Sequence, residues 1–372
     1  MISWKILALL LGLVVSAGIH LRYIRPYRLS PRAGTAAYLG LLICCLGICF
    51  GDFSFQSLTG ELLFPWWQRL FYFLFVLILT IFWITLLADL ILGLPCCLWR
   101  RSRVFYWQSP RVRIVLLSLA LGITCWGQYE GLKLPEIRKI TLASSRISRP
   151  LTVALVTDLH INRLSDPDRI RRVVRRINRL DPDLTVLAGD ILDDQIGLIR
   201  DLARPLGKLK AHRGVFFTTG NHEFYHSHLD AGDLMTKLGI QVLDNRGRRI
   251  RKDVFLGGIP DLKASRRHGE RADPRKALKS SRKSQYRILI SHEPYPLKGA
   301  DLVLSGHTHG GQFFPFQIPA WLKNGGLLAG LYEMPSGQRI IVSRGAGTWG
   351  PAFRIFAPGD ILLITLLPEN NR

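Results

Sequence analysis

The chain has 372 residues and is strongly basic, with 50 Lys and Arg against 27 Asp and Glu and a formal net charge of +23. This charge favours anionic partners, either lipid headgroups or a phosphorylated substrate. Nucleic acid is not expected as a partner, because no basic motif interleaved with base-stacking aromatic residues accompanies the charge. All six cysteines precede residue 126, which excludes a disulfide framework and a thiolate metal site from the rest of the chain.

The first part of the chain, residues 1–128, is mostly apolar and is predicted to be a membrane domain. A helix that spans a bilayer needs about 20 apolar residues. We expect about four transmembrane helices in an all-α bundle, with three as the alternative, from four stretches: Trp4–Leu21, Ala36–Phe50, Leu70–Leu94 and Val112–Trp126. The third stretch is flanked by tryptophans of the kind found at membrane interfaces: Trp66, Trp67, Trp99 and Trp107.

Arginines in the short connections predict the orientation, because such residues stay on the cytoplasmic side. They lie between the first two stretches and around the connection of the last two: Arg22, Arg25, Arg28, Arg32, Arg100, Arg101, Arg103, Arg111 and Arg113. The chain is therefore expected to be a multi-pass protein of the cell (inner) membrane, with its C-terminal domain outside, periplasmic in a Gram-negative host. A cleaved signal peptide at the first stretch is the alternative. Asp89 is either a functional intramembrane carboxylate or a residue that faces the bundle.

After a linker at 129–150, residues 151–372 are predicted to form an α/β domain. Five short apolar runs indicate buried strands: Leu151–Thr157, Leu184–Ala188, Val215–Thr219, Arg287–Ile290 and Leu302–Ser305. Helices are expected from Asp166 to Leu180, at Asp201–Lys210 and at Leu229–Leu238, and further strands at Arg339–Val342 and Ile361–Leu366. The segment Lys263–Ser284 is expected to be a lid or a membrane-surface helix.

Each of the five strands is followed at once by a motif that carries histidine or carboxylate side chains. The motifs are Asp158-Leu-His160, Gly189-Asp190, Gly220-Asn221-His222-Glu223, Ser291-His292-Glu293 and Gly306-His307-Thr308-His309. Alone, a Gly-Asp is usually a turn and a buried His a core residue, but all five in order predict a ligand site at the carboxyl ends of the strands. The glycines are expected to let the backbone turn sharply so that the side chains converge.

The residue types fit a centre of two divalent metal ions. Carboxylate and imidazole ligands suit Mn, Fe, Zn or Co, and a bridging carboxylate can hold two ions roughly 3.5–4 Å apart. Asp190 is the natural bridge. Two ions would acidify a shared water to the hydroxide nucleophile and neutralise phosphate oxygens, which is what phosphoester hydrolysis requires.

This ordered set of motifs resembles the signature of the calcineurin-like metallophosphoesterase superfamily. The stretches Gly306–Gln312 and Ser343–Thr348, with Arg354-Ile-Phe, are most similar to its bacterial YkuE/YaeI-like phosphodiesterase branch. The resemblance covers about residues 140–372. It implies a four-layer α/β/β/α sandwich, here preceded by the transmembrane bundle.

The resemblance also implies a role for each motif residue. The first metal would be bound by Asp158, His160, Asp190 and His309, and the second by Asp190, Asn221, His292 and His307. His222 would protonate the leaving oxygen or stabilise the transition state, with Glu223 as a supporting partner. His226 and His228 receive no role, and Asp193 and Asp194 are either acceptors behind the ligands or helix caps.

The function expected is metal-dependent hydrolysis of a phosphomonoester or, in preference, a phosphodiester that is lipid-linked or close to the membrane. One alternative is a pyrophosphatase acting on a nucleotide-linked lipid precursor of the UDP-2,3-diacylglucosamine type, which would need cytoplasmic access. Another is a non-catalytic membrane interaction module.

Overall fold

The computed structural model describes residues 4–24, 30, 32–36, 38–39, 42, 65–93 and 109–369. The chain divides into two compact units. One contains Met1–Tyr129 with Gly350–Phe353, and the other contains Glu130–Trp349 with Arg354–Arg372.

The described residues of the first unit are mostly helical. Helix α1, Trp4–Ile19, continues as a π-helical turn over His20–Ile24, and α3, Pro65–Ala88, continues in the same way over Asp89–Gly93. Helix α6 spans Pro110–Leu132. By length and composition, Gln68–Ile91 and Pro110–Leu132 are apolar enough to cross a membrane, and Gly12–Ile24 is a shorter apolar helix. The expected stretch Ala36–Phe50 lies almost entirely outside the described residues, as do all cysteines except Cys125.

One charged residue of this unit lies differently from the expectation. Arg22 is buried in a helical turn instead of lying in a connecting loop. Its Nη2 is 3.6 Å from Oδ1 of Asp89. A charge removed from water is stabilised by an opposite charge nearby, so Asp89 has a structural partner within the helical unit.

The second unit contains two six-stranded mixed sheets. The first has the order β1 (Glu136–Ser144), β12 (Asp360–Pro368), β2 (Leu151–Val156), β3 (Leu184–Ala188), β4 (Val215–Thr218) and β5 (Gln241–Val242). The second has the order β10 (Gly330–Glu333), β11 (Arg339–Val342), β9 (Leu302–Ser305), β8 (Tyr286–Ile290), β7 (Val254–Gly258) and β6 (Arg246–Arg249). The strands β2 to β5 run parallel, as do β11, β9, β8 and β7.

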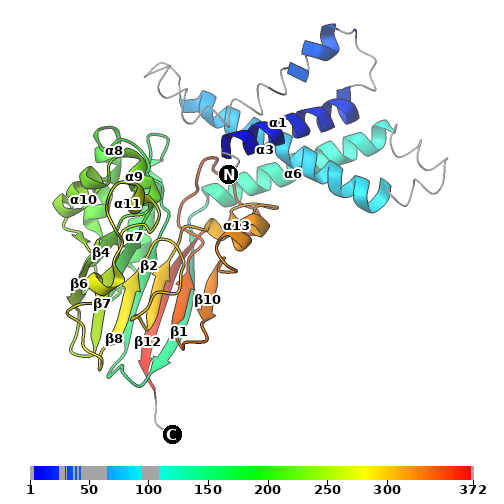
Figure 1. Cartoon of the computed structure of the whole chain (residues 1–372). Coiled ribbons are helices and arrows are strands. Elements are labelled where there is room, and N and C mark those ends of the chain that lie inside the picture. Colours follow the sequence, from blue (N-terminus) through cyan, green and yellow to red (C-terminus); the bar gives the residue numbers. More distant parts are fainter. Residues whose placement is uncertain are drawn as a thin grey trace. The chain divides into compact units, whose positions relative to one another are not determined.

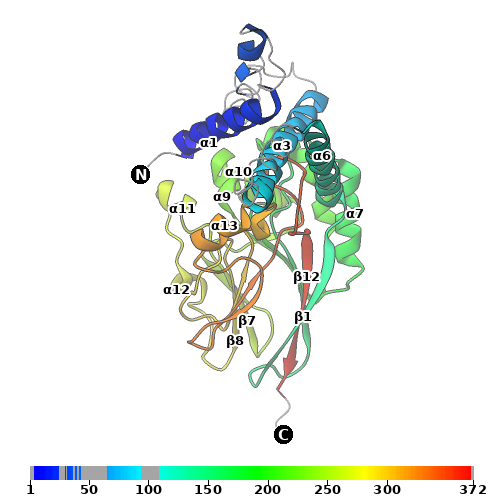
Figure 2. The ribbon, with the colours of Figure 1, turned by 90° about the vertical axis from the view of Figure 1, so that its right-hand side faces the viewer.

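The central strands are mostly apolar because both of their faces are buried. On β2, Leu155 packs into the core between the two sheets, whereas Ala154 packs against the helices. Those helices cover the outer face of the first sheet: α7 (Pro167–Asn178), α8 (Ile196–Ala203) and α10 (His228–Lys237) (Figure 1). The short helix α12, Pro274–Ala277, lies beside β7 on the second sheet (Figure 2). The predicted α/β fold is confirmed, and it contains two mixed sheets.

Two local predictions need correction. The range 129–150, expected as a linker, contains β1, which pairs with β12 along all of its length. The helix expected at 201–210 breaks after Ala203 into a 3₁₀ segment, Arg204–Lys208, because Pro205 lacks a backbone donor. The segment 263–284, expected to be a lid or a membrane-surface helix, contains the short helices α11 (Ala264–Arg267) and α12, with Gly269 at φ +77° between them.

Candidate dimetal site

The five motifs lie where strands of both sheets end. Those after β2, β3 and β4 come from the first sheet, and those after β8 and β9 come from the second. Hydrogen bonds join the loops: the Asp158 amide donates to Gly189 O (3.0 Å), and the His307 amide donates to Asp158 Oδ1 (3.1 Å). The structure thus brings together seven side chains that the sequence analysis singled out: Asp158, His160, Asp190, Asn221, His292, His307 and His309.

The side chains form two adjoining clusters. In one, Nε2 of His309 is 3.0 Å from Nε2 of His160 and 3.4 Å from Oδ1 of Asp158. In the other, Nε2 of His292 is 3.0 Å from Oδ2 of Asp190, and Nδ1 of His307 is 3.3 Å from that same Nε2. The Asn221 side-chain oxygen completes the second cluster, 3.0 Å from Nδ1 of His307.

Asp190 lies between the clusters. Its Oδ2 is 3.0 Å from Nε2 of His292 and 4.0 Å from Nε2 of His160. Each cluster offers at least three potential ligand atoms within 4.8 Å of one another. A set of carboxylate and imidazole groups at this spacing fits divalent cations of the transition series.

Two of the imidazoles, His292 and His160, have partners on Nδ1 that orient the rings. His292 Nδ1 lies 2.9 Å from the carbonyl oxygen of Ala188, and His160 Nδ1 lies 3.0 Å from Oδ2 of Asp193. Such partners hold Nδ1 as a donor and leave Nε2 as the ligand atom, which is the usual arrangement of metal-binding histidines. The donor set therefore fits a divalent metal centre.

Burial and neighbouring charges shift the pKa values of several side chains in the clusters. Burial alone would raise the pKa of Asp190, but the charges of His292 and His222 outweigh it and hold that pKa well below its usual range. Burial would lower the pKa of His292, but Asp190 raises it well above the usual value. Burial and neighbouring cations hold the pKa values of His307 and His309 well below normal, so both imidazoles are neutral and available as ligands.

The backbone of the site is strained. Five of its non-glycine residues adopt left-handed conformations with φ between 48° and 70°: Asp158, His160, Asp190, His307 and His309. Each such residue costs on the order of 1–3 kcal/mol and persists only where surrounding interactions impose it. These left-handed conformations direct the side chains away from the strand ends and toward one another.

The glycines of the motifs serve two purposes. Gly189 has φ +81°, as expected for a sharp turn. Gly220 and Gly306 do not have positive φ values. They are needed because a Cβ would overlap the carboxylate of Asp190 or of Asp158, respectively. Gly220 and Gly306 are therefore required for close packing, whereas Gly189 is required for its turn.

Glu223 organises the loop that carries Asp190. Its buried carboxylate accepts hydrogen bonds from the amides of Gly220 (2.7 Å), Asp190 (3.0 Å), Ile191 (2.8 Å) and Leu192 (2.9 Å). These contacts fix the backbone on which the central carboxylate stands.

His222 and His160 share one carboxylate. Asp193 accepts from Nδ1 of His222 through Oδ1 (2.5 Å) and contacts Nδ1 of His160 through Oδ2 (3.0 Å). Burial would lower the pKa of His222, but Asp190 and the hydrogen bond to Asp193 outweigh burial and raise it to about 9. Asp193 is thus an acceptor behind the site, and its neighbour Asp194 instead pairs with Arg163.

The other histidines of this region lie outside the clusters. His226 Nε2 is 3.9 Å from Oδ1 of Asp193. His228 stacks on Phe224 and lies 3.0 Å from Oε1 of Glu270. Neither contacts a predicted ligand within the part of the chain that the structure describes.

A residue that the motifs did not identify holds the loop of His309. Arg354 is only 1% exposed, and its guanidinium donates to the carbonyl oxygens of Ala357 (2.7 Å), Arg344 (2.8 Å) and His309 (3.2 Å). The sequence pointed to Arg354 only through the similarity of Arg354-Ile-Phe to the family, because no local pattern distinguishes a buried arginine from an exposed one.

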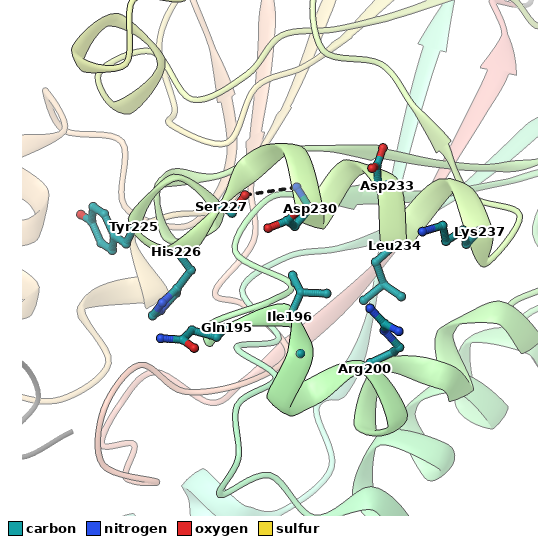
Figure 3. Close-up of a pocket in the computed structure, with 11 residues that line it drawn as sticks. Gln195, Ile196, Arg200, Tyr225, His226, Ser227, Asp230, Asp233, Leu234 and Lys237 are labelled. Carbon is teal, nitrogen blue, oxygen red and sulfur yellow. Dashed lines mark hydrogen bonds between the residues drawn. The ribbon is translucent and has the colours of Figure 1, made fainter. Parts of the chain in front are cut away.

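A polar cavity of about 530 Å³ lies beside the site, between α8, α10 and helix α9, Asn221–His226. Figure 3 shows Tyr225, His226 and Gln195 at one end and Arg200 and Lys237 toward the other. None of the seven predicted ligands lines it. It adjoins the site through Tyr225, whose hydroxyl accepts from Nδ2 of Asn221 (3.1 Å).

Comparison with known proteins identifies the family. The family model described as calcineurin-like phosphoesterase matches residues 151–311. An uncharacterised metallophosphoesterase of Helicobacter pylori is 34% identical over 257 residues, covering 68% of this chain and 69% of the relative. A transmembrane protein with metallophosphoesterase domain of Danio rerio is 31% identical, covering 69% of this chain and 63% of the relative.

A more distant relative is a UDP-2,3-diacylglucosamine pyrophosphatase of Chlamydia muridarum, 24% identical over 63% of this chain and 91% of the relative. The motifs at the strand ends, their convergence and these similarities lead to one conclusion. The chain belongs to the calcineurin-like metallophosphoesterase family and is a metal-dependent phosphoester hydrolase.

Proposed function

We propose that the chain is a membrane-anchored dimetal hydrolase of phosphomonoesters or phosphodiesters, with diesters preferred and a lipid-linked or membrane-proximal substrate. The observation that carries the proposal is the position of Asp190, whose Oδ2 faces both clusters. We assign Asp158, His160, Asp190 and His309 to a first ion, and Asp190, Asn221, His292 and His307 to a second. The ions are Mn, Fe, Zn or Co.

Bound ions would polarise the phosphate and lower the pKa of a water molecule. His222 supplies the proton that the leaving oxygen needs. Asp193 engages its Nδ1, so Nε2 is the nitrogen left to deliver that proton, and the raised pKa keeps the ring charged at neutral pH. Glu223 holds the Asp190 loop in place.

We assign a membrane domain to residues 1–128 and the catalytic domain to residues 151–372, with β1 of the connecting segment completing the catalytic sheet. We further propose about four membrane crossings, an inner-membrane location and a catalytic domain outside the cytoplasm. The described helices of membrane length and the zebrafish relative support the anchor. The arginines of the short connections support the orientation. Gly306–Gln312 and Ser343–Thr348 support membership of the YkuE/YaeI-like branch.

The alternative substrate is a nucleotide-linked lipid pyrophosphate, which the printed activity of the Chlamydia relative favours. A cytoplasmic catalytic domain would suit that substrate. Fusions of alkaline phosphatase and of a fluorescent protein to the C-terminus distinguish the two arrangements. We expect an active phosphatase fusion, whereas an inactive phosphatase with a fluorescent partner fusion would favour the nucleotide-lipid reaction.

A hydrolysis screen tests the reaction itself. The purified full chain, loaded in turn with Mn, Fe, Zn or Co, is offered aryl phosphomonoesters, aryl phosphodiesters, lipid phosphates and UDP-linked lipids. We expect turnover of the diesters. Turnover of UDP-linked lipids alone would establish the alternative, and no turnover with any metal would indicate a non-catalytic membrane module.

A further inference from the structure

The catalytic unit exposes a group of large apolar side chains on and around helix α13, Gln317–Lys323. No residue of α13 is buried. Ile318 is 57% exposed, Trp321 49% and Leu322 65%. We define the α13 surface as Phe314, Phe316, Ile318, Trp321, Leu322 and Trp349, all of which are exposed. Soluble proteins rarely leave such a group facing water unless another phase or molecule covers it.

The α13 surface is fixed to the edge of the dimetal site. Gln312 follows the short 3₁₀ segment His309–Gly311, and its side chain exchanges two hydrogen bonds of 2.9 Å with the backbone of Trp349. The Trp349 ring in turn lies 6.4 Å from the ring of His222, centroid to centroid. The apolar surface therefore begins where a substrate would approach the proposed acid.

The charges around the α13 surface suit an anionic interface. No Asp or Glu occurs between Asp301 and Glu333, and Lys323 at the end of α13 is exposed. Tryptophan favours the headgroup level of a bilayer, and apolar side chains favour the boundary with the acyl chains. A lysine beside them is attracted to anionic headgroups.

The chain connection limits how far the catalytic sheet can lie from the end of α6. Helix α6 ends at Leu132 and β1 begins at Glu136. Only Lys133, Leu134 and Pro135 intervene, so four residue steps separate Leu132 from Glu136 and span at most about 14 Å. If α6 crosses the membrane, as in the proposed function, the first strand begins close to the bilayer surface.

We propose that the α13 surface docks on the bilayer interface and presents the dimetal site to phosphoesters carried by membrane lipids. This inference rests on the proposed function and specifies the phase from which the substrate enters. The phosphate reaches the metal ligands while the hydrocarbon part of the substrate remains in the lipid beside α13.

A matched pair of substrates tests the inference on the full chain, loaded with Mn in nanodiscs of phosphatidylcholine and phosphatidylglycerol. Both substrates are 4-nitrophenyl phosphodiesters, and their second ester group is either ethyl or hexadecyl. The variant is Trp321→Ser with Leu322→Ser. The control is Leu229→Ser, because Leu229 is 68% exposed on α10, away from the α13 surface.

We expect the double variant to lose about tenfold or more in kcat/KM on the hexadecyl diester, because the substitutions remove apolar area that would contact lipid. On the ethyl diester it should keep wild-type activity. The control should match the wild type on both. Equal kcat/KM of variant and wild type on the hexadecyl diester would overturn the inference. An equal loss on both diesters would overturn it too, since the residues would then act on catalysis and not on lipid contact.

A second measurement does not depend on turnover, so it separates this inference from the proposed function. An environment-sensitive fluorescent amino acid replaces Trp321 or, as the control, Leu229, in the full chain in nanodiscs that contain nitroxide-labelled lipid. We expect the lipid to quench the fluorophore at position 321 and not at position 229. No quenching at position 321 would overturn the docking proposal even if both diesters are hydrolysed.

Discussion

His160 and His309 face each other with their Nε2 atoms 3.0 Å apart in the interior of the site. A proton on one nitrogen can satisfy both atoms, but two protons cannot be accommodated. Burial and the neighbouring His160 ring hold the pKa of His309 well below its usual value. Within residues 109–369, Nδ1 of His309 has no hydrogen-bond partner. The proposed first ion would take both Nε2 atoms as ligands and would relieve this arrangement.

Metal binding should release protons at neutral pH. Asp190 raises the pKa of His292 well above its usual value, so the ring is charged before metal binds, and a metal-bound imidazole nitrogen carries no proton. Metal affinity should therefore fall as the pH is lowered. Calorimetric titration of the metal-free chain with Mn, in buffers of different ionisation enthalpy at pH 7, should show about one proton released. No release at this pH would mean that His292 is already neutral.

Asp193 is predicted to be a positioning residue for His160 and His222. Asp193→Asn should weaken metal binding or slow turnover by about 10–100-fold, because an amide cannot accept from both imidazoles as the carboxylate does. The matched control is Asp194→Asn, since Asp194 contacts Arg163 and neither histidine. Metal dissociation constants and kcat are measured for both. Equal behaviour of the two variants would remove this role from Asp193.

His222 is predicted to act on the leaving group. His222→Ala should keep its metal ions and lose about 10²–10⁴-fold in rate on alkyl esters, whose leaving oxygens need a proton. The loss should be smaller on aryl esters, whose leaving groups are stable anions. His226→Ala is the control, because His226 lies beside Asp193 without a hydrogen bond to it. Equal losses on both ester types, together with reduced metal content, would place His222 among the ligands.

The sequence predicted the strand-and-motif pattern of the catalytic domain because every motif directly follows a mostly apolar run. Leu184–Ala188 and Leu302–Ser305 are strands with the predicted bounds, and they are buried on both faces. Such runs carry strong local information, since a buried central strand tolerates few polar residues. Parallel strand ends then predict which side chains meet.

Other features depend on distant parts of the chain and left no local pattern. Strand β1 is half-exposed and exists because β12, more than two hundred residues later, pairs with it. The resemblance and the residue types left Asp193 ambiguous, because only the fold brings it between two imidazoles. The need for glycine at position 306 likewise arises from the nearby Asp158, which belongs to the other sheet.

Arg354 is another residue whose role depends on distant parts of the chain. It leads to a prediction about the stability of the catalytic unit. Arg354→Met should destabilise the catalytic unit by about 2–5 kcal/mol, because the buried carbonyl oxygens that it now satisfies would lose their donors. Arg171→Met is the control, since Arg171 forms an exposed pair with Asp168 and should leave stability nearly unchanged. Thermal unfolding of the full chain in detergent, followed by near-ultraviolet circular dichroism, compares them. Equal midpoints for the two variants would show that the Arg354 contacts add nothing.

The central claim is that Asp190 is shared by two metal ions. Elemental analysis of purified wild type, Asp190→Ala and Asp158→Ala tests it directly, alongside turnover of an aryl phosphodiester. We predict about two ions per chain in the wild type, loss of both with activity in Asp190→Ala, and loss of mainly one in Asp158→Ala. If Asp190→Ala retained two ions per chain and near-normal turnover, the dinuclear assignment would be wrong.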